Sequence, residues 1–103
     1  MATFRRHPNA SMEPSRLKVI YSGRVQGVGF RYTTKMTARG FDVTGTVRNR
    51  SDGTVELIAE GERSELEAFR DAIRLSELGS AMRDEKASWS PAQGGFRGFE
   101  IIS

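Results

Sequence analysis

The sequence predicts an α+β sandwich, in which an antiparallel β-sheet carries two α-helices on one face. Some segments alternate apolar and polar residues as strands do, and two others have the features of helices. In chain order the elements are βαββαββ, which is the ferredoxin-like order with an extra terminal strand. At 103 residues the chain is long enough for one domain with a single core.

Five segments have the composition of strands. They are rich in β-branched and aromatic residues, or they alternate apolar with polar side chains. In order, these segments are residues 17–25, 41–49, 54–61, 83–90 and 96–102. Ser51-Asp52-Gly53 is typical of a hairpin turn between the second and third strands, whereas Pro91 and Gly94-Gly95 separate the last two.

The two helices are predicted from different signals. Residues 30–39 contain neither Gly nor Pro, and Gly40 is placed to end the helix. Ser64 and Glu67 form a capping-box pattern at the start of the second helix, which is expected to end near Leu78. The buried stripe of this helix should contain Leu66, Phe69, Ala72 and Ile73.

Residues 1–15 are expected to form a disordered tail, and residues 16–103 to form the domain. The tail has two of the three prolines and no hydrophobic period. Its basic and serine content is also found in mitochondrial presequences, but the prolines argue against that interpretation. Met12 is an alternative start, and His7, the only histidine, is given no role.

The composition favours a soluble, cytoplasmic protein, and we expect a monomer. No stretch approaches the roughly 18 apolar residues of a membrane span, and the N-terminus lacks the apolar core of a secretory signal. The chain has no cysteine, which excludes disulfides and thiolate catalysis. Its net charge of +3 arises from interspersed charges of both signs. Such a balance helps to attract a small phosphorylated anion and does not require a nucleic-acid partner, and we expect no membrane partner.

The segment from Gly23 to Arg31, GRVQGVGFR, has the features of an anion site. Gly23, Gly27 and Gly29 can adopt positive φ and turn several N–H groups towards one point. Arg31 falls in the first turn of the predicted helix, where the helix dipole also favours an anion. The simpler alternative is a turn that only joins strand to helix. A nucleotide-binding loop does not fit, because Tyr32 stands where the third glycine would be.

Asn49 stands just before the hairpin turn, and taken alone it is most simply a turn residue that bonds its own backbone. Its amide can also donate to one partner while accepting from another, as the positioning of a water molecule requires. The sequence contains no Ser-His-Asp or Cys-His set that would indicate nucleophilic catalysis by a side chain.

Two motifs together resemble the signature of the acylphosphatases, small enzymes that hydrolyse carboxyl–phosphate mixed anhydrides. The motifs are GRVQGVGFR at 23–31 and VRNRSDGTVE at 47–56. Their arginine and asparagine are 49 − 31 = 18 positions apart, a spacing that fits the family. The resemblance runs from about Leu17 to Ile101, and it implies the same fold that the pattern predicts.

The resemblance also implies the site residues. In the family the arginine binds the phosphoryl group of the substrate together with loop amides, a role that falls here to Arg31. The loop amides would be those of Gln26, Gly27, Val28, Gly29 and Phe30. The family's asparagine orients the attacking water, as Asn49 would here. An acyl phosphate is then the substrate, inorganic phosphate is both product and inhibitor, and neither a cofactor nor a metal is expected.

Three features depart from the pattern of the family. Thr46 replaces a common tryptophan in the strand before Asn49, and Asp42 replaces a glycine after the first helix. Residues 76–82 lack the usual Gly-Pro turn, so the exit from the second helix is not predicted. These differences concern packing and turns, not the chemistry.

Two other functions are open at this point. An RNA-recognition domain would share the fold, but the predicted strand at 54–61 has no aromatic residue for base stacking and carries two carboxylates. A non-catalytic, acylphosphatase-like module would bind an anion or RNA without turnover. The presence of both Arg31 and Asn49 favours the enzyme.

Overall fold

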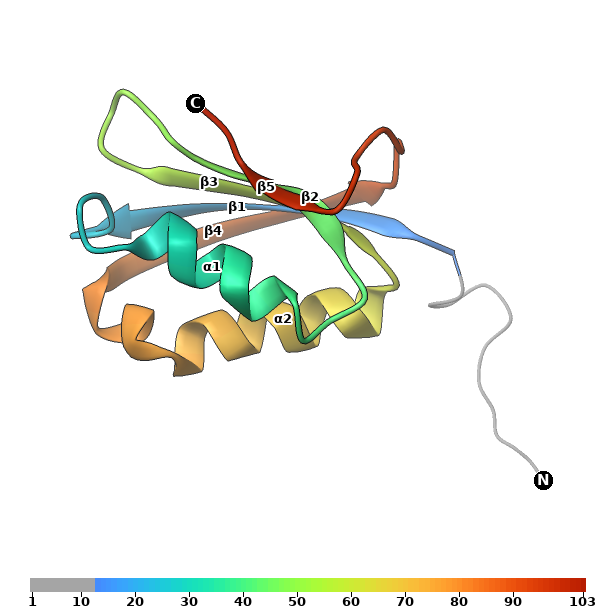
Figure 1. Ribbon diagram of the computed structural model, residues 1–103, viewed down its shortest axis with the longest axis horizontal. Helices are drawn as coiled ribbons and strands as arrows, with labels where there is room; N and C mark the ends of the chain where they lie inside the picture. Colours follow the sequence, from blue (N-terminus) through green and yellow to red (C-terminus); the bar gives the residue numbers. More distant parts are fainter. Residues whose placement is uncertain (1–12) are drawn as a thin grey trace.

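Residues 13–103, the part of the chain that the computed structural model describes, form five strands and two helices in the predicted order (Figure 1). The strands are β1 (Ser15–Gly23), β2 (Thr44–Asn49), β3 (Val55–Gly61), β4 (Met82–Pro91) and β5 (Phe99–Ile101). The helices are α1 (Phe30–Ala38) and α2 (Arg63–Leu75), and α2 is followed by the 3-10 helix η2 (Glu77–Ala81). Most of the expected tail, residues 1–12, lies outside the described residues, and β1 begins two positions before the predicted strand.

The strands form one sheet in the order β4-β1-β3-β2-β5. β1 pairs antiparallel with β3 and β4, and β2 pairs antiparallel with β3, as predicted. β5 instead pairs parallel with β2, so the expectation of an entirely antiparallel sheet fails at this edge. The reason is the direction of the chain. It reverses after β4 and crosses to the opposite edge of the sheet, where β2 already runs the same way as β5.

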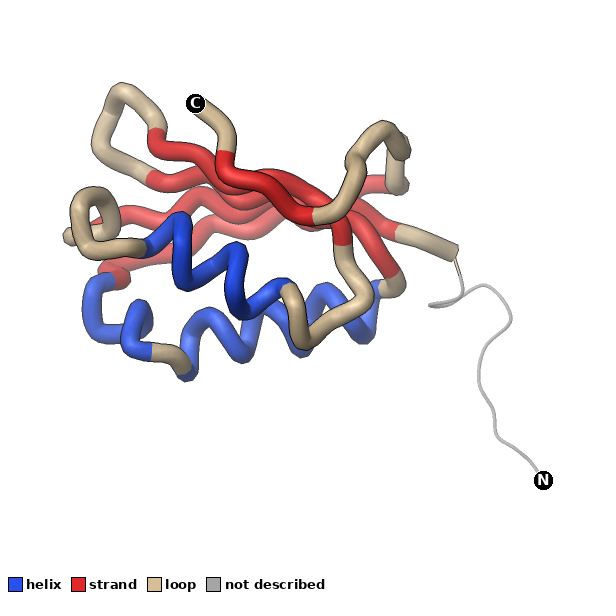
Figure 2. Tube along the Cα trace, in the orientation of Figure 1, coloured by secondary structure: helices blue, strands red, loops and turns tan. Residues whose placement is uncertain are grey.

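Both helices lie on the same face of the sheet, which confirms the ferredoxin-like sandwich (Figure 2). Leu66, Phe69 and Ile73 of α2 are fully buried, as predicted for the stripe, whereas its fourth predicted residue, Ala72, is half-buried. The Phe69 ring lies 5.8 Å from the ring of Phe41 and 5.6 Å from that of Phe99. This aromatic cluster joins α2 to β5 and to the segment between α1 and β2, and it fixes the position of the last strand.

The capping box predicted for α2 is wrong. The helix begins at Arg63, its N-cap is Glu62, and no side chain bonds the free N–H groups of the cap. Because β3 continues to Gly61, only one residue separates strand from helix, and Ser64 falls inside the first turn. Glu67 pairs instead with Arg63, with 3.3 Å between the carboxylate and the guanidinium.

The end of α2 is also earlier than predicted. The hydroxyl of Ser76 donates to the carbonyl of Ile73 at 2.6 Å and accepts the N–H of Leu78 at 3.1 Å. Such local bonds from a serine compete with the helical pattern. The chain therefore leaves α2 at Leu75 and continues as η2, which supplies the exit that the sequence did not predict.

On the uncovered face of the sheet, the two carboxylates of β3 are paired with cations of neighbouring strands. Glu60 is 6% exposed and accepts from Arg16 at 2.7 Å. Glu56 is 8% exposed, and its carboxylate oxygens lie 2.7 Å from Nε of Arg48 and 3.7 Å from Nζ of Lys18. Burial acts to raise the pKa of Glu56, but the hydrogen bond and charge of Arg48 outweigh it and hold that pKa below its usual value. This face therefore carries paired charges where an RNA-recognition sheet needs stacking aromatics.

Gly45→Ala is expected to destabilise the domain strongly. Gly45 has a φ of +155°, and a Cβ there would overlap the carbonyl oxygen of Ile58 on β3. Gly53→Ala in the hairpin turn is the matched control, because its φ is +90° but a Cβ would meet nothing within 4 Å. By chemical denaturation we expect a loss of about 1 kcal/mol for Gly53→Ala and at least ~3 kcal/mol for Gly45→Ala. Equal losses would show that the close approach to β3 is unimportant.

Candidate active site

The glycine loop, residues 24–29, joins β1 to α1. Gly23, Gly27 and Gly29 have φ values of +120°, +80° and +77°, which confirms the positive φ predicted for all three. A Cβ at Gly23 would collide with the backbone of Ala81, whereas Gly27 and Gly29 face open space. The backbone of the loop is therefore accessible at these two positions, as N–H groups that bind an anion must be.

Arg31 is the second residue of α1, at the end of this loop. Gly29 is the N-cap of the helix, no side chain bonds the cap, and no acidic residue lies in the first turn. The first N–H groups of α1 and its dipole thus favour an anion at this end. Within residues 13–103, Arg31 forms no ion pair, so its guanidinium is free to bind a ligand.

Asn49 is the last residue of β2, directly before the hairpin turn. Its Oδ1 is buried and has no hydrogen-bond partner among the described residues. Leaving a buried acceptor unpaired costs about 1–3 kcal/mol, so each such atom calls for an explanation. The hydroxyls of Tyr21 and Thr34 are also buried and unpaired in the described residues, but only Asn49 of the three lines the pocket described below. The turn itself is stabilised by Asp52, whose carboxylate accepts from the N–H of Thr54 at 3.0 Å and from its hydroxyl at 2.6 Å. Asp52, not Asn49, is the turn-stabilising residue.

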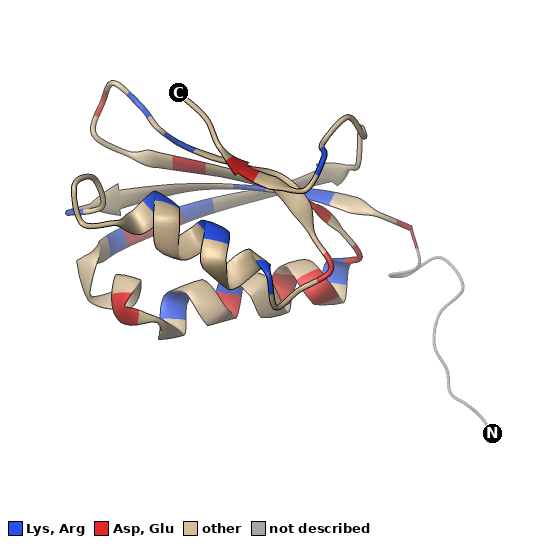
Figure 3. Cartoon of the chain, in the orientation of Figure 1, with Lys and Arg blue, Asp and Glu red and all other residues tan. Residues whose placement is uncertain are grey.

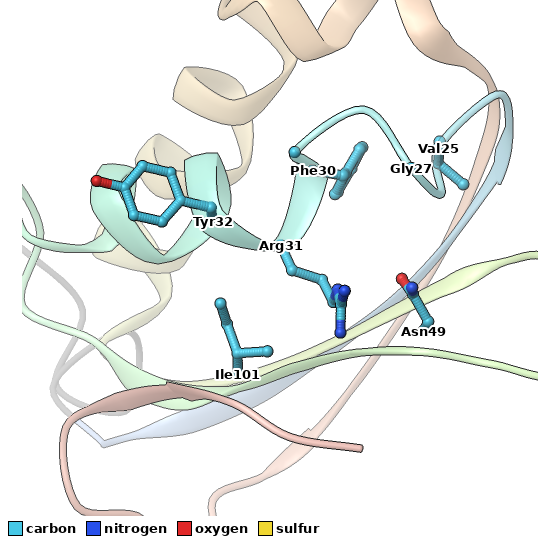
Figure 4. Close-up of a pocket in the computed structure, with 8 residues that line it drawn as sticks. Val25, Gly27, Phe30, Arg31, Tyr32, Asn49 and Ile101 are labelled. Carbon is cyan, nitrogen blue, oxygen red and sulfur yellow. The ribbon is translucent and has the colours of Figure 1, made fainter.

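Arg31 and Asn49 come together at a pocket of about 200 Å³ (Figure 4). Figure 4 shows the guanidinium of Arg31 and the amide of Asn49 pointing towards one another, with the glycine loop beside them. The pocket is lined by Val25, Gly27, Gly29, Phe30, Arg31, Tyr32, Asn49 and Ile101. Five of the seven predicted site residues are among these, and Gln26 and Val28 are not.

Three lining residues, Val25, Tyr32 and Ile101, were not predicted from the sequence. Val25 belongs to the glycine loop and its side chain is fully buried, whereas Tyr32 and Ile101 are 63% and 38% exposed. The proximity of Tyr32 to the arginine could have suggested it. No local signal could have indicated Ile101, because β5 reaches the site only by crossing the sheet to pair with β2.

Gln26 contributes to the site by its side chain in a way that the sequence did not suggest. Its amide nitrogen donates to the carbonyl of Arg50 at 2.8 Å and to that of Thr54 at 2.9 Å. Both acceptors belong to the hairpin turn that follows Asn49. The two donors of one primary amide are thus used in full, and they tie the glycine loop to the turn that carries Asn49.

The pocket is suited to an oxyanion. Its one charged side chain is the guanidinium of Arg31, and the other polar side chains in its lining are the Asn49 amide and the Tyr32 hydroxyl. A planar guanidinium can bind two phosphate oxygens at once. Nowhere in the described part of the chain do three histidine, aspartate or glutamate side chains gather in a way that could hold a metal ion.

The fold and the pocket define a small α+β domain with a pocket suited to an oxyanion between a glycine loop and the end of a hairpin strand. A family model for acylphosphatases matches residues 17–101. The chain is 43% identical over 86 residues to an acylphosphatase of Salinibacter ruber, covering 84% of this chain and 90% of that protein. It is 45% identical over 84 residues to an acylphosphatase of Bacillus licheniformis, covering 82% of this chain and 93% of that protein.

Solved structures agree with the sequence relatives. The crystal structure of an acylphosphatase from Bacillus subtilis superposes with a TM-score of 0.79 at 37% identity, covering 86% of this chain and 99% of that chain. The protein therefore belongs to the acylphosphatase family. Family and fold favour an enzyme over a non-catalytic binding module.

Gln26→Leu is expected to lower the free energy of unfolding by about 1–3 kcal/mol, because two hydrogen bonds are lost and the carbonyls of Arg50 and Thr54 each keep only the backbone donor within the turn. Amide hydrogen exchange in residues 50–54 should become faster, since the turn is no longer held by the loop. Gln93→Leu is the matched control, because that side chain is exposed and its hydrogen bond to Glu60 uses the backbone N–H. Unchanged exchange in the turn of Gln26→Leu would contradict the role given to these bonds.

Proposed function

We propose that the protein hydrolyses the carboxyl–phosphate bond of acyl phosphates, with Arg31 binding the phosphoryl group and Asn49 positioning the attacking water. Membership of the acylphosphatase family supports the reaction. The observation that carries the residue assignment is the unpaired, buried oxygen of Asn49, which lines the same pocket as the free guanidinium of Arg31.

The phosphoryl group would be held by charge and by backbone donors. The guanidinium of Arg31 would bind two of its oxygens, and the N–H groups of residues 26–30 would bind the others. Gly27 and Gly29 line the pocket without side chains, so the phosphoryl group can approach the backbone closely. These donors would also stabilise the charge on the phosphoryl oxygens in the transition state.

The nucleophile would be a water molecule that donates a hydrogen bond to Oδ1 of Asn49. A neutral amide suits this position, because a carboxylate there would repel the anionic substrate. The water oxygen attacks phosphorus in line while the bond from phosphorus to the acyl oxygen breaks. The carboxylate leaves with the bonding electrons, and a phosphoryl oxygen takes the proton of the water.

This chemistry needs few catalytic groups, because a carboxylate is a weak base and leaves without protonation. Positioning and electrostatic stabilisation can then supply most of the rate enhancement. An alcohol, by contrast, needs a general acid to leave, and none of the pocket residues is a carboxylic acid or histidine. We therefore expect acyl phosphates to be hydrolysed much faster than phosphomonoesters, with no cofactor or metal required.

The proposal extends to the cellular location and the oligomeric state of the protein. The chain has charges of both signs along its length, and we propose that it acts as a cytoplasmic monomer in which the catalytic domain begins with β1 at Ser15. No helix in residues 13–103 has the length and apolar content needed to cross a membrane.

Arg31→Ala and Asn49→Ala are expected to affect different kinetic constants. Asn49→Ala should lower kcat by about 10²-fold or more, because it removes an interaction with the nucleophile, while phosphate binding is largely kept. Arg31→Ala should weaken phosphate binding and lower kcat together, because the same oxygens are bound before and during the reaction. Arg31→Lys should restore little, since an ammonium group cannot bind in a bidentate manner.

The measurements are steady-state kinetics with benzoyl phosphate and the inhibition constant of phosphate for each variant. Arg24→Ala is the control, because Arg24 is an exposed arginine of the same loop that does not line the pocket. Normal phosphate binding by Arg31→Ala, or full turnover by Asn49→Ala, would refute the role of that residue.

Inorganic phosphate should inhibit competitively and stabilise the fold, because it presents the group that the loop and Arg31 bind. At a hundredfold excess over its dissociation constant, linkage predicts about 2.7 kcal/mol of added stability. The measurement is the thermal or urea unfolding midpoint with increasing phosphate at constant ionic strength, with chloride as control. An unchanged midpoint in saturating phosphate would count against the site.

A further inference from the structure

One flank of α1 carries a row of cations that begins at the candidate active site, and two of the three, at positions 31 and 35, are half-buried. Arg31, Lys35 and Arg39 are spaced four residues apart, which places them one above another on the helix. α1 has no acidic residue, as Figure 3 also shows, whereas α2 carries both signs of charge. Like charges at this spacing destabilise a helix by about 0.2–0.5 kcal/mol per pair. Lys35 in the last turn and Arg39 at the C-cap also interact favourably with the helix dipole, so the repulsion between the cations is offset at this end of α1 and remains unexplained only at Arg31.

None of these three cations is neutralised by a neighbour within the described residues. Ion pairs elsewhere on the domain engage Arg16, Arg48 and Arg70, among others, but not the cations of this row. Two carboxylates lie near this row of cations, one just after α1 in the sequence and one on β5, but both line other hollows of the surface. Asp42 lies in the lining of one with Glu60, and Glu100 in that of another.

A hollow of about 270 Å³ lies beside the second and third of these cations. It is lined by Lys35, Ala38, Arg39, Phe41, Val43 and Phe99. Its floor is apolar, because Phe41, Val43 and Phe99 are half-buried and pack against the core. Its rim is cationic. We call this hollow the distal hollow.

The distal hollow adjoins the active-site pocket. Both lie between α1 and β5, and one turn of helix, about 6 Å, separates Arg31 in the pocket from Lys35 in the hollow. On the strand, Ile101 lines the pocket and Phe99 lines the hollow. These residues are two apart, about 7 Å, and point to the same side of β5. A ligand held at Arg31 can thus extend over Ile101 and Phe99 towards Lys35.

We propose that the distal hollow binds the far end of the acyl group, and that it selects acyl phosphates with an apolar stem and a second anionic group. The inference rests on the proposed function, because the phosphoryl group must first be held at Arg31. The stem lies against Ile101 and Phe99, and a carboxylate or phosphate at its far end is bound by Lys35 and Arg39. Lys35 and Arg39 are thus specificity-determining residues, and they take no part in the chemical step.

The test compares three rigid substrates that share a leaving group of similar basicity. They are 4-methylbenzoyl, 4-carboxybenzoyl and 4-phosphonobenzoyl phosphate, of which the last two carry a second anion at the far end of an apolar ring. We expect kcat/KM about three- to tenfold higher for the charged substrates, mainly through KM, since the distal contact is the same in ground and transition states. The better of the two charged substrates identifies the preferred distal group.

The double variant Lys35→Gln, Arg39→Gln should lose this preference. Its control is Arg83→Gln, Lys86→Gln, which removes the same charge from exposed positions of β4 that form no ion pair in the described structure. The control should keep the preference at constant ionic strength. An equal loss in both double variants would mean that the overall field attracts the anion, and the distal hollow would be overturned as its binding site.

Two further outcomes separate this inference from the proposed function. If the natural chain hydrolyses 4-methylbenzoyl phosphate but shows no preference for a second anion, the distal subsite is overturned and the proposed function stands. If the natural chain hydrolyses none of the three substrates, the proposed function is overturned and the subsite with it.

Discussion

The two hydrogen bonds from the Gln26 amide to the carbonyls of Arg50 and Thr54 join the two chain segments that build the active-site pocket. One segment provides the loop amides and Arg31, and the other provides Asn49. Phosphoryl transfer with a good leaving group depends on the relative position of phosphorus and water more than on strong acids or bases. The distance between the segments is therefore the quantity that this fold has to fix. It does so with bonds to main-chain atoms, which do not depend on the side chains of the turn.

The charges of the pocket favour the hydrolysis of acyl phosphates over that of phosphomonoesters. A free guanidinium next to open backbone N–H groups favours an anion at every stage, and no carboxylate in the lining opposes it. The absence of a general acid from the lining restricts the leaving group to one that departs as a stable anion. If Arg31 and Asn49 act as proposed, the leaving group rather than a general acid determines which phosphate compounds are hydrolysed.

Local signals in the sequence were sufficient for most of the fold, and motifs in the sequence were sufficient for most of the residues that the structure brings together in the pocket. Glycines that need positive φ, alternating strands and the stripe of α2 depend on near neighbours in the chain, and the paired motifs indicated Arg31 and Asn49. The parallel pairing of β5 was not predictable in this way, because it depends on where the chain crosses the sheet. Ile101 was missed for the same reason. The capping box failed although the end of β3 was predicted correctly, because α2 begins only one residue after that strand and Ser64 therefore falls inside its first turn.

The two edge strands of the sheet, β4 and β5, determine how readily separate molecules can pair through their backbones. An edge strand presents unpaired N–H and C=O groups that can pair with another chain. β5 offers only three residues for this, and β4, although ten residues long, carries Arg83, Asp84 and Lys86 and ends at Pro91. Alternating charges on a strand, and a proline without an N–H at its end, both discourage a further strand from adding. The sheet thus resists growth from either side, which protects a small, strand-rich domain against aggregation.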